Sequence, residues 1–517
     1  MAAISLVLIA LAGWGLTRVP TGFIPTEDQG YLMVAVQMPD GASLERTQKV
    51  MDDVSRIGLA VPGAAHAIAI GTGGPSPLDG DVSLANAGIV YLMLKDWKER
   101  GRAEDLDAVV AGLKRGLGRI QEARTRVLVP APIQGLGASN GFQMQVELTD
   151  GSYDFQRLQK AAEDVIREAN ASPAVRDAFT SFRASVPQVS VKIDKTLAAT
   201  HGVNIGDLYN TVQTYLGSSF VNLFTRYGHN YMVYLQADPM RRLNADDVKN
   251  LYVRNSSGTM VPVGAMAEIR PAFGTSVVSL YNLFPAATIN GMPAPGYSSG
   301  QTLDAMDAIA KRVLPRGMGY EWTAMSYQER LVGNSAYFIF ALSILLVYFA
   351  LAGQYESWIT PAAVILAVPM ALLGTAGALI ALGIANNIYV QIGLVLLIAL
   401  SAKNAILIVE MALEGREKGK GIEEATVDAS RVRFRPILMT SFTFILGVLP
   451  LVLASGAGAA ARRSLGIAVA TGMLASTCLA VLFVPALFVV LRRWIERKGP
   501  APHAAGAVAA AATPPGA

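Results

Sequence analysis

The stretch "VQIGLVLLIALSAKNAILIVEMA", residues 390–412, is apolar enough to cross a lipid bilayer but carries a lysine, Lys403, in its middle. A spanning helix needs about 20 mainly apolar residues. A charge at the centre of such a helix costs about 3 kcal/mol on insertion scales. The stretch therefore predicts a membrane-spanning helix whose lysine requires an anionic partner.

The composition of the whole chain is that of a membrane protein. Of its 517 residues 52% are apolar and only 16% are charged, whereas soluble domains carry about 25% charged residues. The apolar residues gather in runs, and a run of about 18 or more predicts a transmembrane helix. Five runs are this long: about 332–352, 361–384, 388–411, 436–455 and 464–491. We therefore predict five spanning helices within residues 332–495.

Both ends of the chain need separate interpretations. The opening run "MAAISLVLIALAGWGL" has no basic residue before Arg18, so it lacks the basic beginning of a signal peptide. We expect residues 1–18 to be the truncated end of a sixth transmembrane helix. The last segment, residues 499–517, is of low complexity and lacks large apolar residues, which is typical of a disordered tail.

Basic residues orient the predicted helices, because Lys and Arg favour cytoplasmic loops near helix ends. Such residues cluster after the run 388–411 and after the last run, and both clusters fall on one side if all five runs span. The ten residues are Arg416, Lys418, Lys420, Arg431, Arg433, Arg435, Arg492, Arg493, Arg497 and Lys498. The roughly 310 residues between Pro25 and Arg330 must then lie outside the cytoplasm.

This extramembranous block shows one pattern twice. Residues 26–135 alternate in the order β-α-β-β-α-β, which is typical of a ferredoxin-like unit. The pattern restarts in residues 140–182 and ends in residues 272–327. Residues 186–270 form an insertion with its own strands, a helix and a hairpin. The fold prediction is a membrane α-helical bundle with an α+β part; the only cysteine, Cys478, lies in the last run, so no disulfide holds that part.

Three interpretations of Lys403 compete. The end of its run is about 12 Å away at 1.5 Å per residue, too far for the side chain to reach the interface. Glu410 lies on the same face but also about 10 Å away. We therefore expect a buried functional charge that faces other helices. The six apolar runs contain no Asp and no Glu except Glu410, so the partner must come from another polypeptide or from a missing upstream part.

Other polar residues share this region of the predicted bundle. Ser401 and Asn404 flank the lysine, and Arg433 and Thr440 are two turns apart on one face of the next helix. The hydroxyl of Thr440 could instead bond the carbonyl four residues back in its own helix. Patterning alone favours Arg433 as a basic anchor at the cytoplasmic end of its helix.

Seven segments carry a family resemblance: "GFIPTEDQG", "QMPDGASLERTQ", "MSYQER", "LAGQYESW", "GLVLLIALSAKNAILIVE", "RFRPILMTSFTFILGVLPL" and "FVPALFVVLRRW". In this order and spacing they resemble the carboxy-terminal half of resistance-nodulation-division multidrug efflux permeases, and the hydrophobe/amphiphile efflux subfamily fits best. The resemblance runs over about residues 2–498.

This resemblance implies a transporter and not an enzyme. Family members are trimeric, proton-driven antiporters of the bacterial inner membrane, with no cofactor beyond the proton gradient and no nucleic-acid partner. They export hydrophobic or amphiphilic small molecules together with a periplasmic adaptor protein and an outer-membrane channel. The repeated units would be two periplasmic porter subdomains, and the insertion 186–270 would be the docking subdomain.

The resemblance also assigns roles to individual residues. Lys403, Arg433 and Thr440 match the proton-relay positions of the family, so the relay replaces the anchor interpretation of Arg433, and we add the neighbouring Asn404. Their partners would be two aspartates in the amino-terminal half, which this chain lacks.

Candidate substrate residues come from the porter region. Phe142 and Met144 share one face of a predicted strand that resembles a pocket strand of the family, with core packing as the alternative. Phe179 and Phe182 are further candidates. The stretch "GTGGPSPLDGD", residues 71–81, falls where the family has a switch loop but lacks the phenylalanines that members often have there.

Three alternatives stay open or are set aside. A metal-ion efflux variant would need clustered methionines or carboxylates, and Met144 and Met292 are isolated in the sequence. A membrane-anchored enzyme has no support, because the four histidines are scattered and no GxSxG, HExxH or CxxC motif occurs. A non-transporting fragment or assembly subunit remains open, because the chain alone cannot complete the relay.

Overall fold

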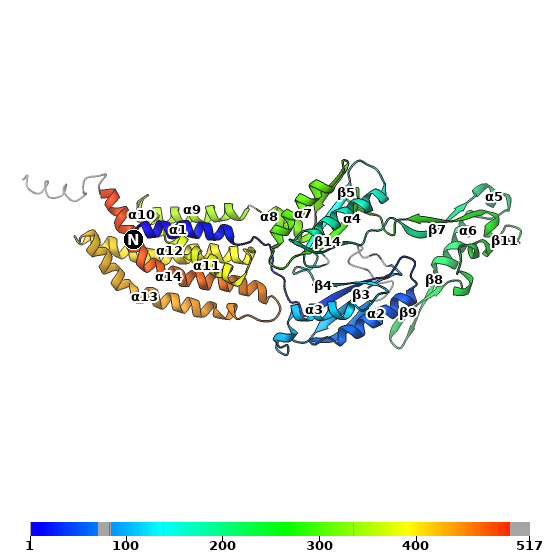
Figure 1. Cartoon of the computed structure of the whole chain (residues 1–517), viewed down its shortest axis with the longest axis horizontal. Helices are drawn as coiled ribbons and strands as arrows, with labels where there is room; N and C mark the ends of the chain where they lie inside the picture. The colour runs from blue at the N-terminus through cyan, green and yellow to red at the C-terminus, as the bar shows by residue number, and fades with distance from the viewer. Residues whose placement is uncertain (1, 71–81, 83, 138, 334, 497–517) are drawn as a thin grey trace, which may run out of the picture.

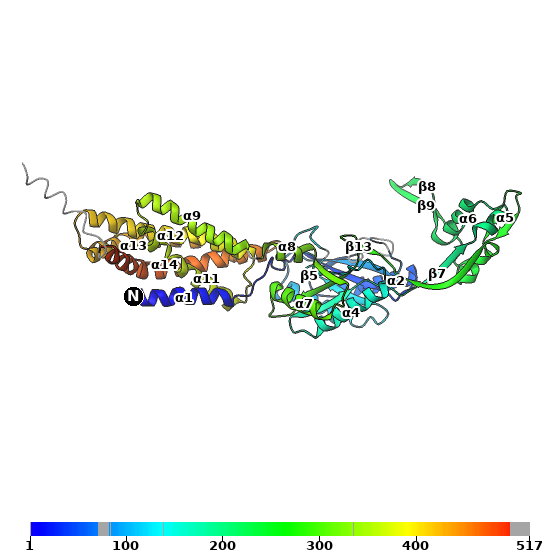
Figure 2. The same cartoon turned by 90° about the horizontal axis from the view of Figure 1, so that it is seen from above.

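The chain is elongated, with three parts in a row (Figure 1). In the computed structural model, which describes residues 2–70, 82, 84–137, 139–333 and 335–496, a helix bundle lies at one end, two α/β units in the middle and a β-rich unit at the far end. Figure 2 shows the same order from a perpendicular direction. The predicted switch loop 71–81 and the predicted tail 499–517 lie outside the described residues.

The bundle contains α1 and α9 to α14. Their bounds are α1 (Ala2–Arg18), α9 (Ser335–Tyr355), α10 (Thr360–Ile365), α11 (Val368–Leu382), α12 (Ile388–Glu417), α13 (Ile422–Val452) and α14 (Ala459–Glu496). Among the described residues five segments are long and apolar enough to span a membrane, which confirms the five predicted runs by length and composition. The apolar part of α1, Ile4–Arg18, is shorter than a span, so the prediction of six spans is met for five helices only.

The predicted run 361–384 is one span built from two helices. α10 ends at Ile365 and α11 begins at Val368, with Pro369 in its first turn. A proline has no backbone N–H and its ring collides with the carbonyl four residues earlier, which here belongs to Ile365. The helix is therefore interrupted between Ile365 and Val368, where an unbroken helix would bring the proline ring against this carbonyl.

α14 lies at the centre of the bundle and packs against α10, α11, α12 and α13. Hydrogen bonds join it to three neighbours: Thr375 Oγ1 donates to Ala468 O (2.9 Å), Thr477 Oγ1 donates to Ser441 Oγ (2.8 Å) and Asn387 Nδ2 donates to Ser464 Oγ (3.1 Å). Small residues let the helices approach closely, as is common between membrane helices. A Cβ atom at Gly472 would lie 2.3 Å from Leu397 Cδ1, and one at Gly374 would lie 2.2 Å from Ala475 Cβ.

The first α/β unit follows α1. Its elements are β1 (Tyr31–Gln37), α2 (Leu44–Leu59), β2 (Ala64–Ile70), β3 (Ala87–Leu94), η1 (Arg102–Glu104), α3 (Leu106–Leu117) and β4 (Arg124–Leu128). All its strand pairs are antiparallel and the strand order is β2-β3-β1-β4. Alternate residues of β1, such as Leu32 and Val34, pack with α2 and α3 in one hydrophobic core. The other face of the sheet carries no helix of this unit.

The second α/β unit repeats this chain order. Its elements are β5 (Phe142–Leu148), α4 (Phe155–Ala171), β6 (Val175–Thr180), β13 (Ser279–Tyr281), β14 (Phe284–Pro293), α7 (Ser299–Val313), β15 (Met318–Trp322) and α8 (Ala324–Val332). The strand order is β13-β14-β5-β15, and β6 also pairs with β14. Its core joins one face of β5 to α4 and α7.

The third unit is inserted between β6 and β13. Its elements are β7 (Val186–Ile193), α5 (Lys195–Thr200), α6 (Ile205–Val212), the π-helix η2 (Gln213–Gly217), β8 (Ser219–Arg226), β9 (His229–Leu235), η3 (Pro239–Arg241), η4 (Ala245–Asn250), β10 (Tyr252–Arg254), β11 (Met260–Pro262), η5 (Val263–Ala265) and β12 (Ala267–Gly274). β7 and β12 pair over their whole length; β7 leads from the second unit into the third, and β12 leads back. The unit has a separate core around Leu208 and Met266. The hairpin β8–β9 projects from it with exposed residues throughout β9.

We predict that Gly374→Ala destabilises the bundle, because the new methyl group would meet Ala475 Cβ at 2.2 Å and Thr471 O at 2.8 Å. Overpacking of this kind costs about 1–3 kcal/mol. The matched control is Gly377→Ala on the same helix, where nothing lies within 4 Å. Thermal unfolding of the purified protein in detergent should show a lower midpoint for the first variant only. Equal midpoints for the two variants would contradict the close packing of α11 on α14.

Candidate functional site

The helix-free faces of the two sheets meet across a small apolar contact. Phe179, on β6 of the second unit, packs among Met33, Ala35, Ile89 and Leu128 of the first unit. The partly buried Tyr31 and Tyr91 border this cluster. Among the described residues, the apolar part of the contact between the two units is centred on Phe179.

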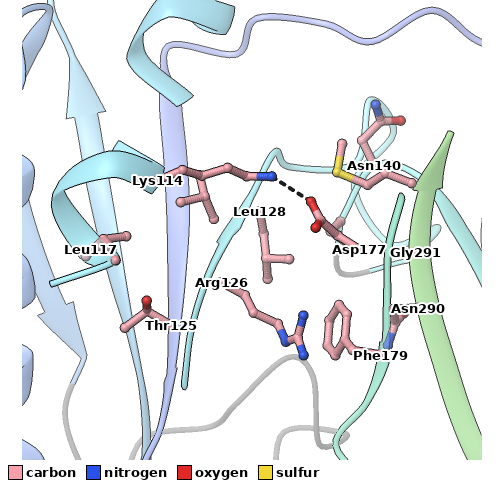
Figure 3. A pocket seen from close by; sticks show the side chains of 14 residues that line it. Lys114, Leu117, Thr125, Arg126, Leu128, Asn140, Asp177, Phe179, Asn290 and Gly291 are labelled. Atoms are coloured by element: carbon pink, nitrogen blue, oxygen red, sulfur yellow. Dashed lines mark hydrogen bonds and ion pairs between the residues drawn. The ribbon is translucent and has the colours of Figure 1, made fainter. Parts of the chain in front are cut away.

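A cavity of about 230 Å³ lies beside this contact (Figure 3). α3 and β4 form one wall, and β6 and β14 form the other. Its lining residues are Lys114, Leu117, Gly118, Thr125, Arg126, Val127, Leu128, Ser139, Asn140, Asp177, Phe179, Asn290, Gly291 and Met292. The cavity thus combines apolar side chains with a few polar groups, which is typical of sites for small molecules.

Charged groups join the two walls of the cavity. Lys114 Nζ of α3 lies 2.6 Å from Asp177 Oδ2 of β6, as the dashed line in Figure 3 shows. Both side chains are more than one-third exposed, so this ion pair contributes little to stability and can open at small cost. Asp177 has a φ of 55°, in the left-handed region that residues other than glycine adopt less often. The pair is a contact between units that can exchange its partners.

The guanidinium of Arg126 stacks on Phe179 inside the cavity. Its Cζ lies 4.1 Å from the ring centroid, which is a favourable cation–π distance. Burial lowers the pKa of Arg126, and the nearby carboxylate of Asp177 opposes that effect. The result is one flat cationic and aromatic surface, against which an amphiphilic molecule can place both an apolar body and a polar group.

The structure separates the four predicted substrate residues. Phe179 lines the cavity, whereas Phe182 is half-buried and lies against Phe155 with ring centroids 6.5 Å apart. Phe142 and Met144 are 4% and 0% exposed and pack in the core with α4 and α7. That placement favours the core-packing alternative for both, and a substrate role for them stays a prediction. Phe142 supports the cavity from behind, because a Cβ at the lining residue Gly291 would lie 2.5 Å from its ring.

A larger cavity, of about 710 Å³, lies where the two units meet the end of the bundle. The segments that line it include 22–26 after α1, 292–297 from the end of β14 onward, 382–385 from the end of α11 onward, and the start of α14 at Ala460 and Arg463. It shares Lys114, Val127, Asn140 and Met292 with the smaller cavity. The two cavities therefore lie side by side and share part of their walls.

A buried carboxylate lies on the polar, helix-free face of the second sheet. Glu147 is 2% exposed, and its Oε1 has no hydrogen-bond partner among the described residues. Burial, with a smaller contribution from Glu321, raises the pKa of Glu147 to about 7. The strand register places Glu147 opposite Ala286, two residue pairs from Thr288–Gln145 and four from the cavity-lining Asn290. Glu147 is not part of the cavity wall.

The raised pKa of Glu147 predicts a pH dependence of stability. Between about 4.5 and about 7 the native chain binds more protons than the unfolded chain, so the free energy of unfolding falls as the pH rises through this window. Glu147→Gln should therefore be more stable than the wild type near pH 8, by up to about 3 kcal/mol, with the difference shrinking toward pH 5. Melting temperatures across this range test this. Glu122→Gln, at an exposed carboxylate, is the control, and a gain in that variant or a pH-independent gain at Glu147 would refute the assignment.

The intramembrane polar residues lie on α12 and α13, which are adjacent helices. Asn404 is 1% exposed and Ser401 is fully buried, whereas Lys403 is exposed on the surface of the bundle. In the part of the chain that the structure describes, Lys403 makes no ion pair or hydrogen bond. Within this chain the side chain of Lys403 is therefore left uncovered, and its burial against helices of another polypeptide stays a prediction.

Several polar atoms inside the bundle are buried without a hydrogen bond among the described residues. Both amide atoms of Asn404 and the hydroxyls of Ser401 and Ser476 are buried without a hydrogen bond among the described residues. A buried polar group without a partner costs about 1–3 kcal/mol. Such a group of polar atoms inside an apolar bundle is typical of a functional site that is completed by other residues or by water.

The remaining predicted relay residues lie on α13. Arg433 is half-buried, and its Nε is buried without a hydrogen bond in the described residues. Thr440 is exposed, and its Oγ1 donates to Ile437 O at 3.1 Å, three residues back and not four. Within the described residues no hydrogen bond or ion pair joins Lys403, Asn404, Arg433 and Thr440 to one another, so their action as one relay stays a prediction.

Sequence reasoning missed most of the cavity. Lys114, Arg126, Asp177 and Asn290 come from four elements that are far apart in the chain and lie in no recognisable motif. The strand alternation could have placed Arg126 and Leu128 on the helix-free face of β4, but it could not have shown which strand faces them.

A bundle of membrane-type helices that carries two α/β units and a third inserted unit outside the membrane defines a large class of polytopic membrane proteins. The chain belongs to the AcrB/AcrD/AcrF family, whose model matches residues 1–492. This is a family of resistance-nodulation-division efflux transporters, so the family predicted from the motifs is confirmed.

Named relatives agree with this family. The chain is 40% identical over 482 residues to the Multidrug export protein AcrF of Escherichia coli, which covers 92% of this chain and 46% of the relative. It is 37% identical over 498 residues to the Multidrug/solvent efflux pump membrane transporter MepB of Pseudomonas putida, which covers 96% of this chain and 47% of the relative. It is 39% identical over 489 residues to the Multidrug resistance protein MdtF of Escherichia coli. The chain spans about half the length of the curated relatives that it matches.

Proposed function

We propose that this chain is the carboxy-terminal half of a proton-driven antiporter of the bacterial inner membrane that exports hydrophobic or amphiphilic compounds. The observation that carries the proposal is Lys403, which lies on a spanning helix and faces outward with no anion from the described chain beside it. An amino-terminal half that brings two aspartates to this face would supply the missing charge. Membership of a family of efflux transporters supports the same conclusion.

The proposed mechanism uses the charge of Lys403 as a switch. With the aspartates ionised, opposite charges hold the lysine between them; protonation of one aspartate weakens that attraction and releases it. The two arrangements form a two-state element, which proton binding biases. Moving one charge through 100 mV is worth about 2.3 kcal/mol, so proton entry can drive the cycle. Arg433, Thr440 and Asn404 would exchange bonds as the helices shift.

The parts outside the membrane take the roles that the family implies. The two α/β units are proposed as ferredoxin-like porter subdomains in the periplasm, which is supported by their shared chain order and by the strand order β2-β3-β1-β4 in the first and β6-β14-β5-β15 in the second. The cavity beside Phe179 is proposed as the drug site. The third unit is proposed as the docking subdomain for an outer-membrane channel, within a homotrimer that also binds a periplasmic adaptor, and α1 as the sixth span.

The alternatives have less support. The described residues contain no cluster of three or more His, Cys, Asp or Glu that could hold a metal ion, so no observation favours a metal-ion efflux variant. A non-transporting fragment or assembly subunit differs from the proposal only in whether an amino-terminal half joins this chain. Transport by the reunited halves distinguishes the two.

The first prediction from the proposed function concerns Lys403. In an efflux-deficient host, co-expression of this chain with an amino-terminal half from a relative should raise drug resistance, and Lys403→Ala should return it to the level of the empty host because the counter-charge of the aspartates is lost. Lys418→Ala, just beyond the end of the same helix and exposed, is the matched control and should retain resistance. Minimum inhibitory concentrations and membrane protein amounts are measured together. Resistance from Lys403→Ala would exclude the proposed relay.

A second prediction separates the candidate substrate residues. Phe179→Ala should change which drugs are exported, because it removes the aromatic surface of the cavity and the partner of Arg126. Phe182→Ala should leave the drug profile unchanged, because Phe182 packs beside Phe155 and does not line the cavity. Met144→Ala should lower stability by about 2–5 kcal/mol as a core truncation. If Phe182→Ala changed the drug profile and Phe179→Ala did not, the drug site would instead lie toward the helix-covered side of the sheet.

A further inference from the structure

The segment 20–30, which joins α1 to β1, contains the motif "GFIPTEDQG" that neither the relay nor the cavity explains. Its first part is tied to the turn between α11 and α12. Gly22 N donates to Asn386 O (3.2 Å), Asn386 N donates to Pro20 O (2.8 Å), and Ile388 N donates to Phe23 O (3.0 Å). The linker is thus fixed to the start of α12, the helix that carries Lys403.

Glu27, in the middle of this segment, clamps the first turn of α14. Its carboxylate is 7% exposed; Oε1 accepts from Ala461 N at 2.7 Å and Oε2 accepts from Ala460 N at 3.2 Å. α14 begins at Ala459, so these are amides that no carbonyl inside the helix can satisfy. A carboxylate is the best partner for them, because the N-terminus of a helix carries partial positive charge.

The residues after Glu27 bind the same end of the bundle to the first α/β unit. Asp28 Oδ2 lies 2.8 Å from Nη1 of Arg100, whose side chain is almost fully buried. Arg100 stacks 5.6 Å from the ring centroid of Trp97, and that ring lies close to Gly30 and to Gly456 in the α13–α14 loop. The loop before α14 and the edge of the first unit therefore share one tight contact.

α14 is also the neighbour of α12 along the bundle. Asn387 Nδ2, at the start of α12, donates to Ser464 Oγ (3.1 Å), and Gly472 lies against Leu397 one helix across. Interfaces packed this tightly shift between discrete arrangements and do not deform smoothly. A shift of α12 at Lys403 would therefore reach α14 through these contacts, and Glu27 holds the first turn of α14.

We propose that Glu27 is a positioning residue that couples the bundle to the first α/β unit, so that movement of α14 opens or closes the cavity beside Phe179. This inference rests on the proposed function. Glu27 touches neither the drug nor the proton carrier. It transmits a displacement through its two hydrogen bonds to α14 and through the covalent path of Asp28, Gln29 and Gly30 into β1.

The test uses this chain joined with an amino-terminal half, purified and reconstituted in proteoliposomes with an imposed proton gradient. Glu27→Gln and Glu27→Ala are compared with Glu122→Gln, which removes a carboxylate from an exposed loop. Four quantities are measured: the maximal rate of dye export, the half-saturating dye concentration, dye affinity by fluorescence polarisation, and amide exchange in the peptide that contains Ala460 and Ala461.

The expected result is a loss of coupling with binding retained. Both Glu27 variants should show faster amide exchange at the start of α14 and a maximal rate lowered by about tenfold, with the alanine variant affected more. Their half-saturating concentration and dye affinity should match the control, because a merely structural defect would lower binding and rate together.

Two results would overturn the inference. If amide exchange rises but the maximal rate stays at the control level, the clamp exists and does not couple, whereas transport by the wild type still supports the proposed function. If dye affinity and rate fall together in the Glu27 variants, Glu27 only maintains the fold. Failure of the wild type and the control to export dye would refute the proposed function itself, and the inference with it.

Discussion

A lysine within the hydrocarbon layer is the constraint on which the rest of this structure depends. Lys403 cannot reach the interface, and in the described chain no carboxylate lies beside it. The cost of this charge is of the same order as the total stability margin of a small domain. Lys403 is exposed on α12 and little of α13 is buried, so under the proposed function this side of the bundle is where further residues would pack.

The two α/β units outside the bundle also contact each other through few residues. The two α/β units each have a complete core under their helices, yet they meet through Phe179 and a few charged groups. Because most of the burial lies within each unit, the units can move as rigid bodies at small cost. The exposed pair Lys114–Asp177 joins the units but contributes too little to lock them in one arrangement.

The sequence predicts those features that depend on local pattern or on the length of a run. Five spans follow from apolar length, and the break before Pro369 is explained by its missing N–H. Period-2 alternation correctly groups Phe142 with Met144, but alternation does not tell which face of a sheet meets its helices, and both side chains lie in the core. Phe179 and Phe182 are equivalent by sequence, and only the packing of β6 against the first unit separates them.

Features that join distant parts of the chain lie beyond such reasoning. The cavity collects α3, β4, β6 and β14, and the clamp joins Glu27 to a helix that begins more than 430 residues later. No spacing rule relates these positions. The sequence predicts that Lys403 needs a partner, because the energetic cost of a charge in an apolar helix depends on local residues. A partner that lies in a distant segment can be identified only from the three-dimensional structure.

The hairpin β8–β9, at the far end of the molecule, is also left uncovered by the rest of the described chain. Its aromatic and aliphatic side chains, such as Phe224 and Tyr231, are exposed on both faces, and Tyr227 and Gly228 make its tight turn. A two-stranded hairpin alone is only marginally stable in water, and a strand without an apolar and a polar face has weak register. Cleavage by a protease at this hairpin would therefore report whether another chain covers it, while telling little about whether the chain itself has folded.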